Sequence, residues 1–160
     1  MVTAWETAAS VPDPELPMLT IADLGILRDV REDGGAVTVT ITPTYSGCPA
    51  LGEIAADLRG RLAAAGYREV TVRTELSPPW SAGQITAEGR RKLAAAGIAP
   101  PERRGPAPER DGPVPVPLRV RCPRCGSADT RQTARFSGTA CKALYRCLAC
   151  LEPFEHVKEF

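Results

Sequence analysis

The chain has 160 residues, of which 43% are hydrophobic and 24% charged, and its formal net charge is +1 at pH 7. That length holds one ordinary domain and a small second one, and the composition is typical of a soluble globular protein. The near-neutral charge excludes a strong general attraction to nucleic acid. No apolar window reaches the roughly eighteen residues of a membrane span.

The N-terminal segment MVTAWETAAS has neither the basic nor the apolar region of a secretory signal, so we expect a cytoplasmic protein without a membrane partner. Six cysteines in that reducing compartment indicate metal or thiol chemistry rather than a disulfide framework.

The first half of the chain predicts a small α/β sandwich of about three strands and two or three helices. Residues 26–32 and 36–42 flank the turn DGG and predict a hairpin. Residues 50–66 carry apolar side chains at helical spacing. Residues 69–75 predict a third strand, which a helical crossover places parallel to the second. A last helix is predicted over residues 86–97.

The stretch TPTYSGCPALGE, residues 43–54, contains Cys48, the one cysteine of this half. Pro49 suits the first helical position, which makes Cys48 the predicted N-cap. Unpaired N–H groups and the helix dipole favour a thiolate there, so Cys48 suits metal binding or nucleophilic attack; a small buried residue at a tight turn is the equal alternative. A Cys–His hydrolase is disfavoured, because the only histidine is His156, in the other half.

Two loops of the first half carry further candidates. DPELP, residues 13–17, holds Asp13 and Glu15 in a proline-constrained turn, where carboxylates act as ligands, or more often cap helices or face water. SPPWS, residues 77–81, places Trp80 in a polar loop. Trp80 is a candidate partner contact, and a lid over the local core is the favoured alternative.

Residues 100–117 contain seven prolines and two glycines and predict an extended, semi-rigid linker. The linker divides the chain into a first domain, residues 1–99, and a second, residues 118–160. The first carries 9 basic and 12 acidic side chains and the second 8 basic and 4 acidic. This asymmetry indicates two different kinds of domain.

The second domain is predicted to be a zinc ribbon. Its cysteines follow the spacing C-x2-C-x21-C-x2-C, namely Cys122, Cys125, Cys147 and Cys150. Four thiolates at that spacing close a tetrahedron around one cation, for which zinc is the default and a single iron, as in rubredoxin, the alternative. Residues 128–136 and 142–147 supply strands. So small a domain needs its metal to fold, and Cys141 and His156 are weaker ligand candidates.

Several motifs together resemble the D-subunit family of bacterial phenylacetyl-CoA epoxidase systems, also called PaaD or PaaJ, over nearly the whole chain. They are DPELPMLTIADLG, TPTYSGCPA, SPPW, EGRRKLAAAGIAPP and TACKALYRCLACLEPFEHVK. The first half is similar to the small domain of iron–sulfur cluster assembly accessory proteins, whose signature is the DPE turn and the cysteine of the GCP turn. The resemblance implies that Cys48 is a transient iron or cluster ligand supported by Asp13 and Glu15. After Trp80 the chain departs from the family pattern, with SAGQI in place of a threonine-rich, acidic, aromatic run.

The resemblance further implies a non-catalytic maturation factor of the epoxidase in phenylacetate catabolism. Its clients and partners would be the reductase subunit, with an iron–sulfur cluster, and the oxygenase subunit, with a di-iron centre. The expected cofactors are a structural zinc in the ribbon and a transient iron or iron–sulfur cluster. Two alternatives stay open: a structural subunit of the oxygenase complex, and a rubredoxin-like electron carrier. Nucleic acid is not an expected partner.

Overall fold

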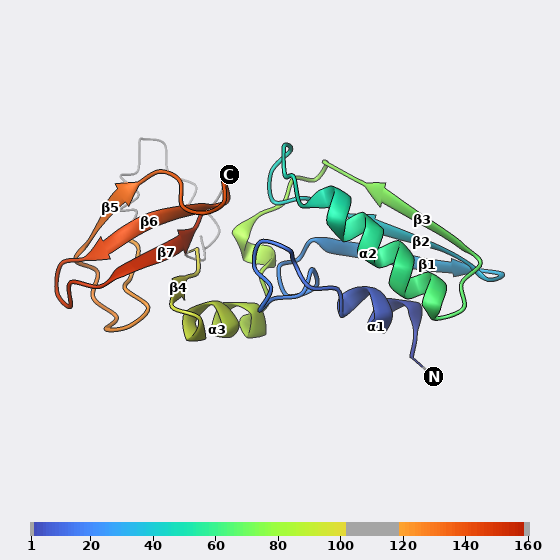
Figure 1. Cartoon of the computed structure of the whole chain (residues 1–160), viewed down its shortest axis with the longest axis horizontal. Helices are drawn as coiled ribbons and strands as arrows, with labels where there is room; N and C mark the ends of the chain where they lie inside the picture. The colour runs from blue at the N-terminus through green and yellow to red at the C-terminus, as the bar shows by residue number, and fades with distance from the viewer. Residues whose placement is uncertain (1, 102–118, 159–160) are drawn as a thin grey trace, which may run out of the picture. The chain divides into compact units, whose positions relative to one another are not determined.

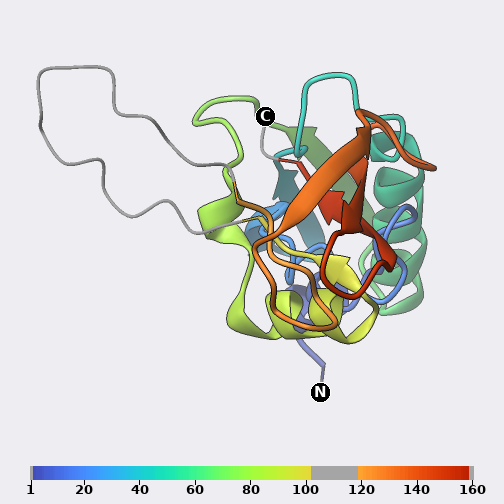
Figure 2. The same cartoon turned by 90° about the vertical axis from the view of Figure 1, so that its left-hand side faces the viewer.

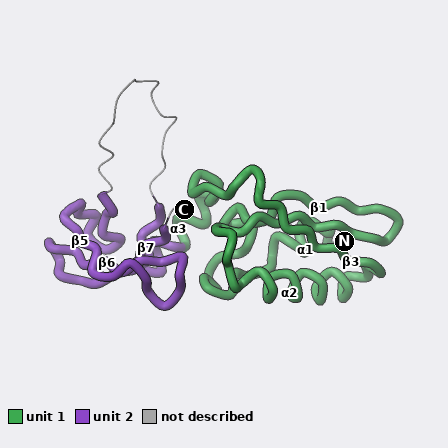
Figure 3. Tube along the Cα trace, turned by 90° about the horizontal axis from the view of Figure 1, so that it is seen from above, with its two compact units in different colours: residues 1–92, 160 green, residues 93–159 purple. Residues whose placement is uncertain are grey.

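The computed structural model describes residues 2–101 and 119–158. Two compact units divide the chain between Lys92 and Leu93, within α3 (Ala87–Ala95), as the two colours of Figure 3 indicate. The sequence predicts the end of the first domain at residue 99, so the predicted and observed boundaries differ. The predicted linker lies outside the described residues, apart from Pro100 and Pro101.

The first unit contains a three-stranded sheet in the order β1-β2-β3. β1 (Leu27–Asp33) and β2 (Ala36–Ile41) form the predicted antiparallel hairpin, in which Gly34 and Gly35 both adopt the positive φ angles of a two-residue turn. β3 (Glu69–Thr74) pairs with β2 in parallel, as the helical crossover predicts. The small α/β fold expected for this half is confirmed.

Helices cover one face of this sheet (Figures 1 and 2). α1 (Ala4–Ala9) begins with a capping box between Thr3 and Glu6, and α2 (Leu51–Ala64) confirms the helix predicted from apolar spacing. The apolar stripe of α2 and alternate residues of β2 are buried, as the period of each element requires. These core residues are Ile54, Leu58 and Leu62 of α2 and Val37, Val39 and Ile41 of β2.

The helix α3 confirms the last helix predicted for this half. A loop before β1 is attached to this helix. The Asp23 carboxylate accepts hydrogen bonds from the Thr20 N–H at 3.0 Å and from the Lys92 ammonium at 2.7 Å. Gly89 permits this approach, because a Cβ at that position would lie 2.7 Å from the Asp23 carbonyl oxygen. The contact with α3 thereby holds the loop that carries Asp13 and Glu15 at the C-terminal end of that loop.

The second unit contains a four-stranded sheet in the order β4-β7-β6-β5. β5 (Thr130–Ala134) and β6 (Lys142–Cys147) confirm the two predicted ribbon strands. β7 (Pro153–Val157), which was not predicted, pairs antiparallel with β6, and β4 (Ile98–Ala99) adds to β7 in parallel. Residues at the end of the predicted first domain therefore belong to the ribbon sheet. A small core packs beneath it, formed by Ala99, Val120, Cys122, Cys147 and Phe154.

Candidate functional site

Four cysteines of the second unit converge from two turns. The sulfur atoms of Cys122, Cys125, Cys147 and Cys150 all lie within 4.8 Å of one another. The Cys122 and Cys150 sulfurs are 3.7 Å apart, and those of Cys125 and Cys147 are 3.6 Å apart. A tetrahedron with Zn–S bonds of about 2.3 Å has S···S edges of about 3.8 Å. The group therefore fits one thiolate-bound metal ion, and it is a metal-binding site.

A backbone hydrogen bond stabilises the thiolate of one member of this group, Cys147. The Cys150 N–H points to the Cys147 sulfur at 3.5 Å, and this hydrogen bond is the main reason why the pKa of Cys147 is lowered to about 7. The Gly126 N–H donates to the Cys122 carbonyl at 2.9 Å, with Gly126 at a φ of 75°, and closes the first turn. Both turns thus present sulfur to a cation, as a metal knuckle does.

Cys141 and His156 lie outside the four-cysteine group found among the described residues. Cys141 is buried, and its sulfur lies 3.1 Å from the Thr139 hydroxyl. The His156 Nδ1 is 3.1 Å from the Ala99 carbonyl oxygen, and its ring packs edge-on to Tyr145 with ring centroids 5.5 Å apart. Both residues have contacts of ordinary packing.

Cys48 lies in a turn before α2, and the prediction that it is the N-cap is wrong. The N-cap is Ala50, whose φ and ψ are already helical, and the helix begins at Leu51. The Cys48 N–H donates to the Tyr45 carbonyl at 3.2 Å, while the Cys48 carbonyl accepts from Leu51 at 3.4 Å. These two hydrogen bonds close a separate turn around Pro49, so the regular hydrogen bonds of the helix begin only after it.

The expectation of an activated thiolate at Cys48 is also wrong, because the pKa of this thiol is raised. Half-burial is the largest cause. The Ala50 and Leu51 N–H groups lower the pKa, as a helix N-terminus should, but the negative charges of Glu15 and Asp13 raise it further. The charges of Glu15 and Asp13 therefore act on the Cys48 thiol, although both residues come from a distant part of the sequence.

Asp13 organises the turn that carries these carboxylates. Its side chain is 5% exposed, and its Oδ1 accepts hydrogen bonds from the Glu15 N–H at 2.9 Å and the Leu16 N–H at 2.8 Å. Burial nevertheless raises the pKa of Asp13 above its usual value. The DPE turn is therefore an Asx turn, closed by the Asp13 carboxylate.

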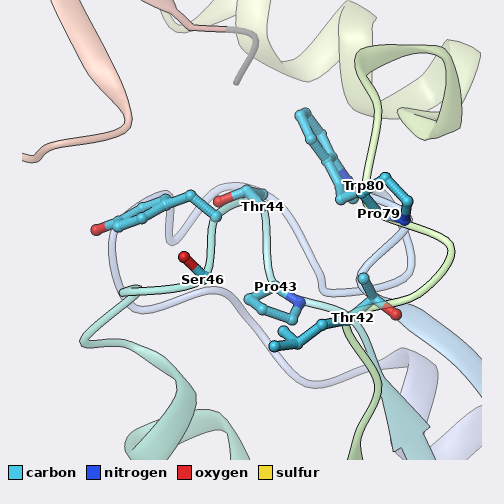
Figure 4. Close-up of a pocket in the computed structure, with 8 residues that line it drawn as sticks. Thr42, Pro43, Thr44, Ser46, Pro79 and Trp80 are labelled. Atoms are coloured by element: carbon cyan, nitrogen blue, oxygen red, sulfur yellow. The ribbon is translucent and has the colours of Figure 1, made fainter.

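A hollow of about 450 Å³ lies beside the segment that leads to Cys48. Figure 4 shows Thr44 and Ser46 on one loop, and Pro79 and Trp80 on another. Trp80 is only 4% exposed, and its indole N–H donates to the Leu24 carbonyl at 2.7 Å, which favours a lid over the local core. The sequence reasoning missed this hollow, although prolines and aromatics in both loops were a signal for it. Its lining residues are Thr42, Pro43, Thr44, Tyr45, Ser46, Leu76, Pro79 and Trp80.

Within residues 2–101 and 119–158, every helix is too short or too polar to cross a membrane.

Two protein families match separate parts of this chain. The family "Iron-sulfur cluster assembly protein" matches residues 5–73, and the family "PaaD zinc beta ribbon domain" matches residues 108–158. A domain of unknown function, DUF59, from Bacillus anthracis is 30% identical, with a TM-score of 0.52 over 56% of this chain and 87% of its own. A conserved hypothetical protein from Thermotoga maritima is 29% identical, with a TM-score of 0.48 over 56% of this chain and 89% of its own.

One similarity extends over both units. A protein of Escherichia coli strain K12, described as the D subunit of 1,2-phenylacetyl-CoA epoxidase, is 40% identical over 154 residues. That alignment covers 96% of this chain and 90% of the relative. Because the alignment spans the assembly-like unit and the ribbon alike, the chain belongs to the D-subunit family of phenylacetyl-CoA epoxidases.

Proposed function

We propose that this protein is a non-catalytic maturation factor for a multicomponent phenylacetyl-CoA epoxidase in phenylacetate catabolism. It assists assembly of the reductase iron–sulfur cluster or the oxygenase di-iron centre, and these subunits are its partners. The family of the whole chain and the match of residues 5–73 to an iron–sulfur cluster assembly family support this role. A cytoplasmic location belongs to the same proposal, because thiols that handle metal need a reducing compartment.

The observation that carries the proposal is that the charges of Glu15 and Asp13 raise the pKa of Cys48. Negative charge beside a thiol raises its pKa, and the same charge attracts a cation. A divalent iron that arrives at this turn displaces the thiol proton and gains one sulfur ligand next to two carboxylates. The thiol returns to its protonated state when the iron leaves, so the site suits transient rather than permanent binding.

A nucleophilic role for Cys48 is disfavoured by the same electrostatics. Nucleophilic cysteines have lowered pKa values and a base that accepts the proton, usually histidine. The pKa of Cys48 is raised, and the only histidine of the sequence, His156, contacts Ala99 and Tyr145. The thiol is therefore protonated at neutral pH unless a cation replaces the proton.

The ribbon is assigned a structural zinc in this proposal. Cys122, Cys125, Cys147 and Cys150 would hold it, and a bound zinc supplies a fixed charge and crosslink without redox chemistry. The small core beside these cysteines is too limited to hold the ribbon strands by itself. A docking role of the ribbon belongs to the alternative, in which the protein is a structural subunit of the oxygenase complex.

The test is a Cys48→Ser variant in cells that produce the complete epoxidase. Serine keeps the size of the side chain but offers a neutral hydroxyl, a poor ligand for a soft cation. We expect the melting temperature of the variant to change little, because Cys48 is only half-buried. The iron content of the purified oxygenase or reductase should fall, and growth on phenylacetate should slow.

Cys141→Ser is the matched control, because it removes a thiol that lies outside the metal group. A stable Cys48→Ser protein that supports full iron loading of both clients would contradict the maturation role. The alternative, a structural subunit of the oxygenase complex, predicts a weakened fold in Cys48→Ser and a growth defect that lower temperature restores. Comparing the melting temperature with client iron separates the two functions.

A further inference from the structure

The outer edge of β3 has no partner strand among the described residues. β3 pairs with β2 along all of Glu69–Thr74 and stands last in its sheet. An edge strand presents a row of N–H and C=O groups that can pair with another chain, and proteins usually block such a row with a bulge, a proline or charged side chains. β3 contains no proline, and its register with β2 is continuous from end to end.

The two faces of β3 differ in chemistry. Val70 and Val72 pair with Val37 and Val39 of β2, which are buried, so the two valines of β3 extend the apolar face of the sheet. The alternate residues Glu69, Thr71 and Arg73 lie on the opposite face, where both charged side chains are exposed. A second strand with the same alternation of apolar and polar residues could therefore pair with β3 with like faces together.

The two exposed charges have opposite signs and stand four residues apart, which makes the strand complementary to itself. If two copies of β3 run antiparallel about a two-fold axis at Thr71, Glu69 of each copy lies opposite Arg73 of the other. Val70 then lies opposite Val72. Centring the axis one residue later sets Glu69 against Glu75, and one residue earlier sets Glu69 against Thr71. Only the Thr71 register joins both opposite charges, and cross-strand pairs of this kind stabilise a sheet.

We propose that β3 is a self-association edge, where a second copy of this chain pairs antiparallel about Thr71. The two three-stranded sheets then form one continuous sheet of six strands. Because paired residues in this register share a face, the helical layers of both copies lie on the same side of the sheet. Both copies contribute the same surface to this interface, so the pairing of Glu69 with Arg73 occurs twice.

The test uses two charge reversals in the full-length, metal-loaded chain. Glu69→Arg leaves only positive charges at the two positions, and Arg73→Glu leaves only negative ones, so each variant opposes like charges twice in its own homodimer. Sedimentation velocity over a concentration series should show a dimer dissociation constant raised about tenfold or more for either variant alone. An equimolar mixture of the two variants pairs opposite charges at all four positions, and it should regain the dimer as a heterodimer.

The mixture also controls for folding, because a misfolded variant cannot be restored by its partner. Arg59→Glu makes the same change of charge at an exposed position of α2, and it should leave the dissociation constant unchanged. A wild-type chain that stays monomeric at the highest concentration would overturn the proposal. So would a dimer that neither reversal weakens, or two weakened variants whose mixture remains monomeric.

Discussion

Taking a thiol out of water costs its charged form more than its neutral form, and neighbouring carboxylates add to that cost. Both effects act on Cys48, whose pKa is raised by burial and then by Glu15 and Asp13, against the opposing N–H groups of Ala50 and Leu51. The helix N-terminus thus has the effect expected of it, but it is outweighed. Cys48 is therefore protonated at neutral pH. The same carboxylates that destabilise its bare thiolate would stabilise a bound cation.

Glu15→Gln should make Cys48 more reactive at a given pH. The pKa of Cys48 is raised in the folded protein, and only its thiolate reacts with iodoacetamide. The alkylation rate should therefore increase at a higher pH than it does for an ordinary thiol. Removing the charge of Glu15 lowers that pKa, so the curve of rate against pH shifts toward lower pH. Mass spectrometry of the Cys48 peptide measures the rate at each pH.

Asp57→Asn is the control for this shift, because Asp57 lies in the middle of α2 and is not among the residues that shift the pKa of Cys48. An unchanged curve for Glu15→Gln, or an equal shift for Asp57→Asn, would mean that Glu15 does not lie beside the thiol. Zinc-loaded protein is used, so that the ribbon thiols are protected.

Only the family resemblance grouped Cys48, Asp13 and Glu15 into one expected site. Their proximity depends on how the loop before β1 folds back toward α2, which local spacing does not determine. The N-cap prediction failed by two residues at Cys48, because hydrogen bonds between Tyr45, Cys48 and Leu51 close a separate turn. The pKa of Cys48 depends on the charges that lie near it in the folded protein, so the sequence alone could not predict whether this pKa is raised or lowered.

At the scale of elements, prediction succeeded where the signal is periodic and local. The hairpin, the crossover helix and the parallel third strand each follow from the spacing of a few apolar side chains and the DGG turn. The two-residue β4 was missed, because a strand that short carries no period and forms only through its partner; β7 was not predicted either. The boundary between the units differed from the prediction for the same reason.

Asp23→Asn should loosen the attachment of α3. Burial raises the pKa of Asp23, but the hydrogen bonds of Lys92 and Thr20 and the charge of Lys92 outweigh it, so the pKa is lowered in the folded state. This stabilisation is complete above the pKa of an unfolded aspartate and is lost as the pH falls through the folded value. We expect the substitution to cost about 2 kcal/mol at pH 7 and almost nothing near the acid limit.

Urea unfolding of both proteins over a pH series measures this cost. Asp57→Asn is again the matched control, because Asp57 pairs with Arg61 on the surface of α2 at 2.9 Å, and an exposed pair contributes less than about 1 kcal/mol. An equal loss for both variants, or a loss for Asp23→Asn that does not depend on pH, would refute a special role for the contact with Lys92.

At the scale of the whole molecule, two units are stabilised by different physics. The first has a core of long aliphatic side chains between a sheet and helices, among them Leu19, Ile21 and Leu58. The second has a small cluster around Phe154 and two of the metal-binding cysteines, and four sulfurs positioned for one ion. Burial of apolar surface explains the first unit, whereas we expect the second to depend on metal binding for most of its folding free energy.

This difference predicts two separable thermal transitions in the metal-loaded chain. A strong chelator should abolish the ribbon transition and leave the first unit's transition almost unmoved, because binding energy in a thiolate site is folding energy. Cys150→Ser should have the same effect without chelator, while Cys48→Ser should keep both transitions and one zinc per chain. Calorimetry combined with metal analysis makes the comparison. A ribbon transition that survives without metal would contradict the structural role, and a coloured, iron-loaded ribbon would favour the electron-carrier alternative.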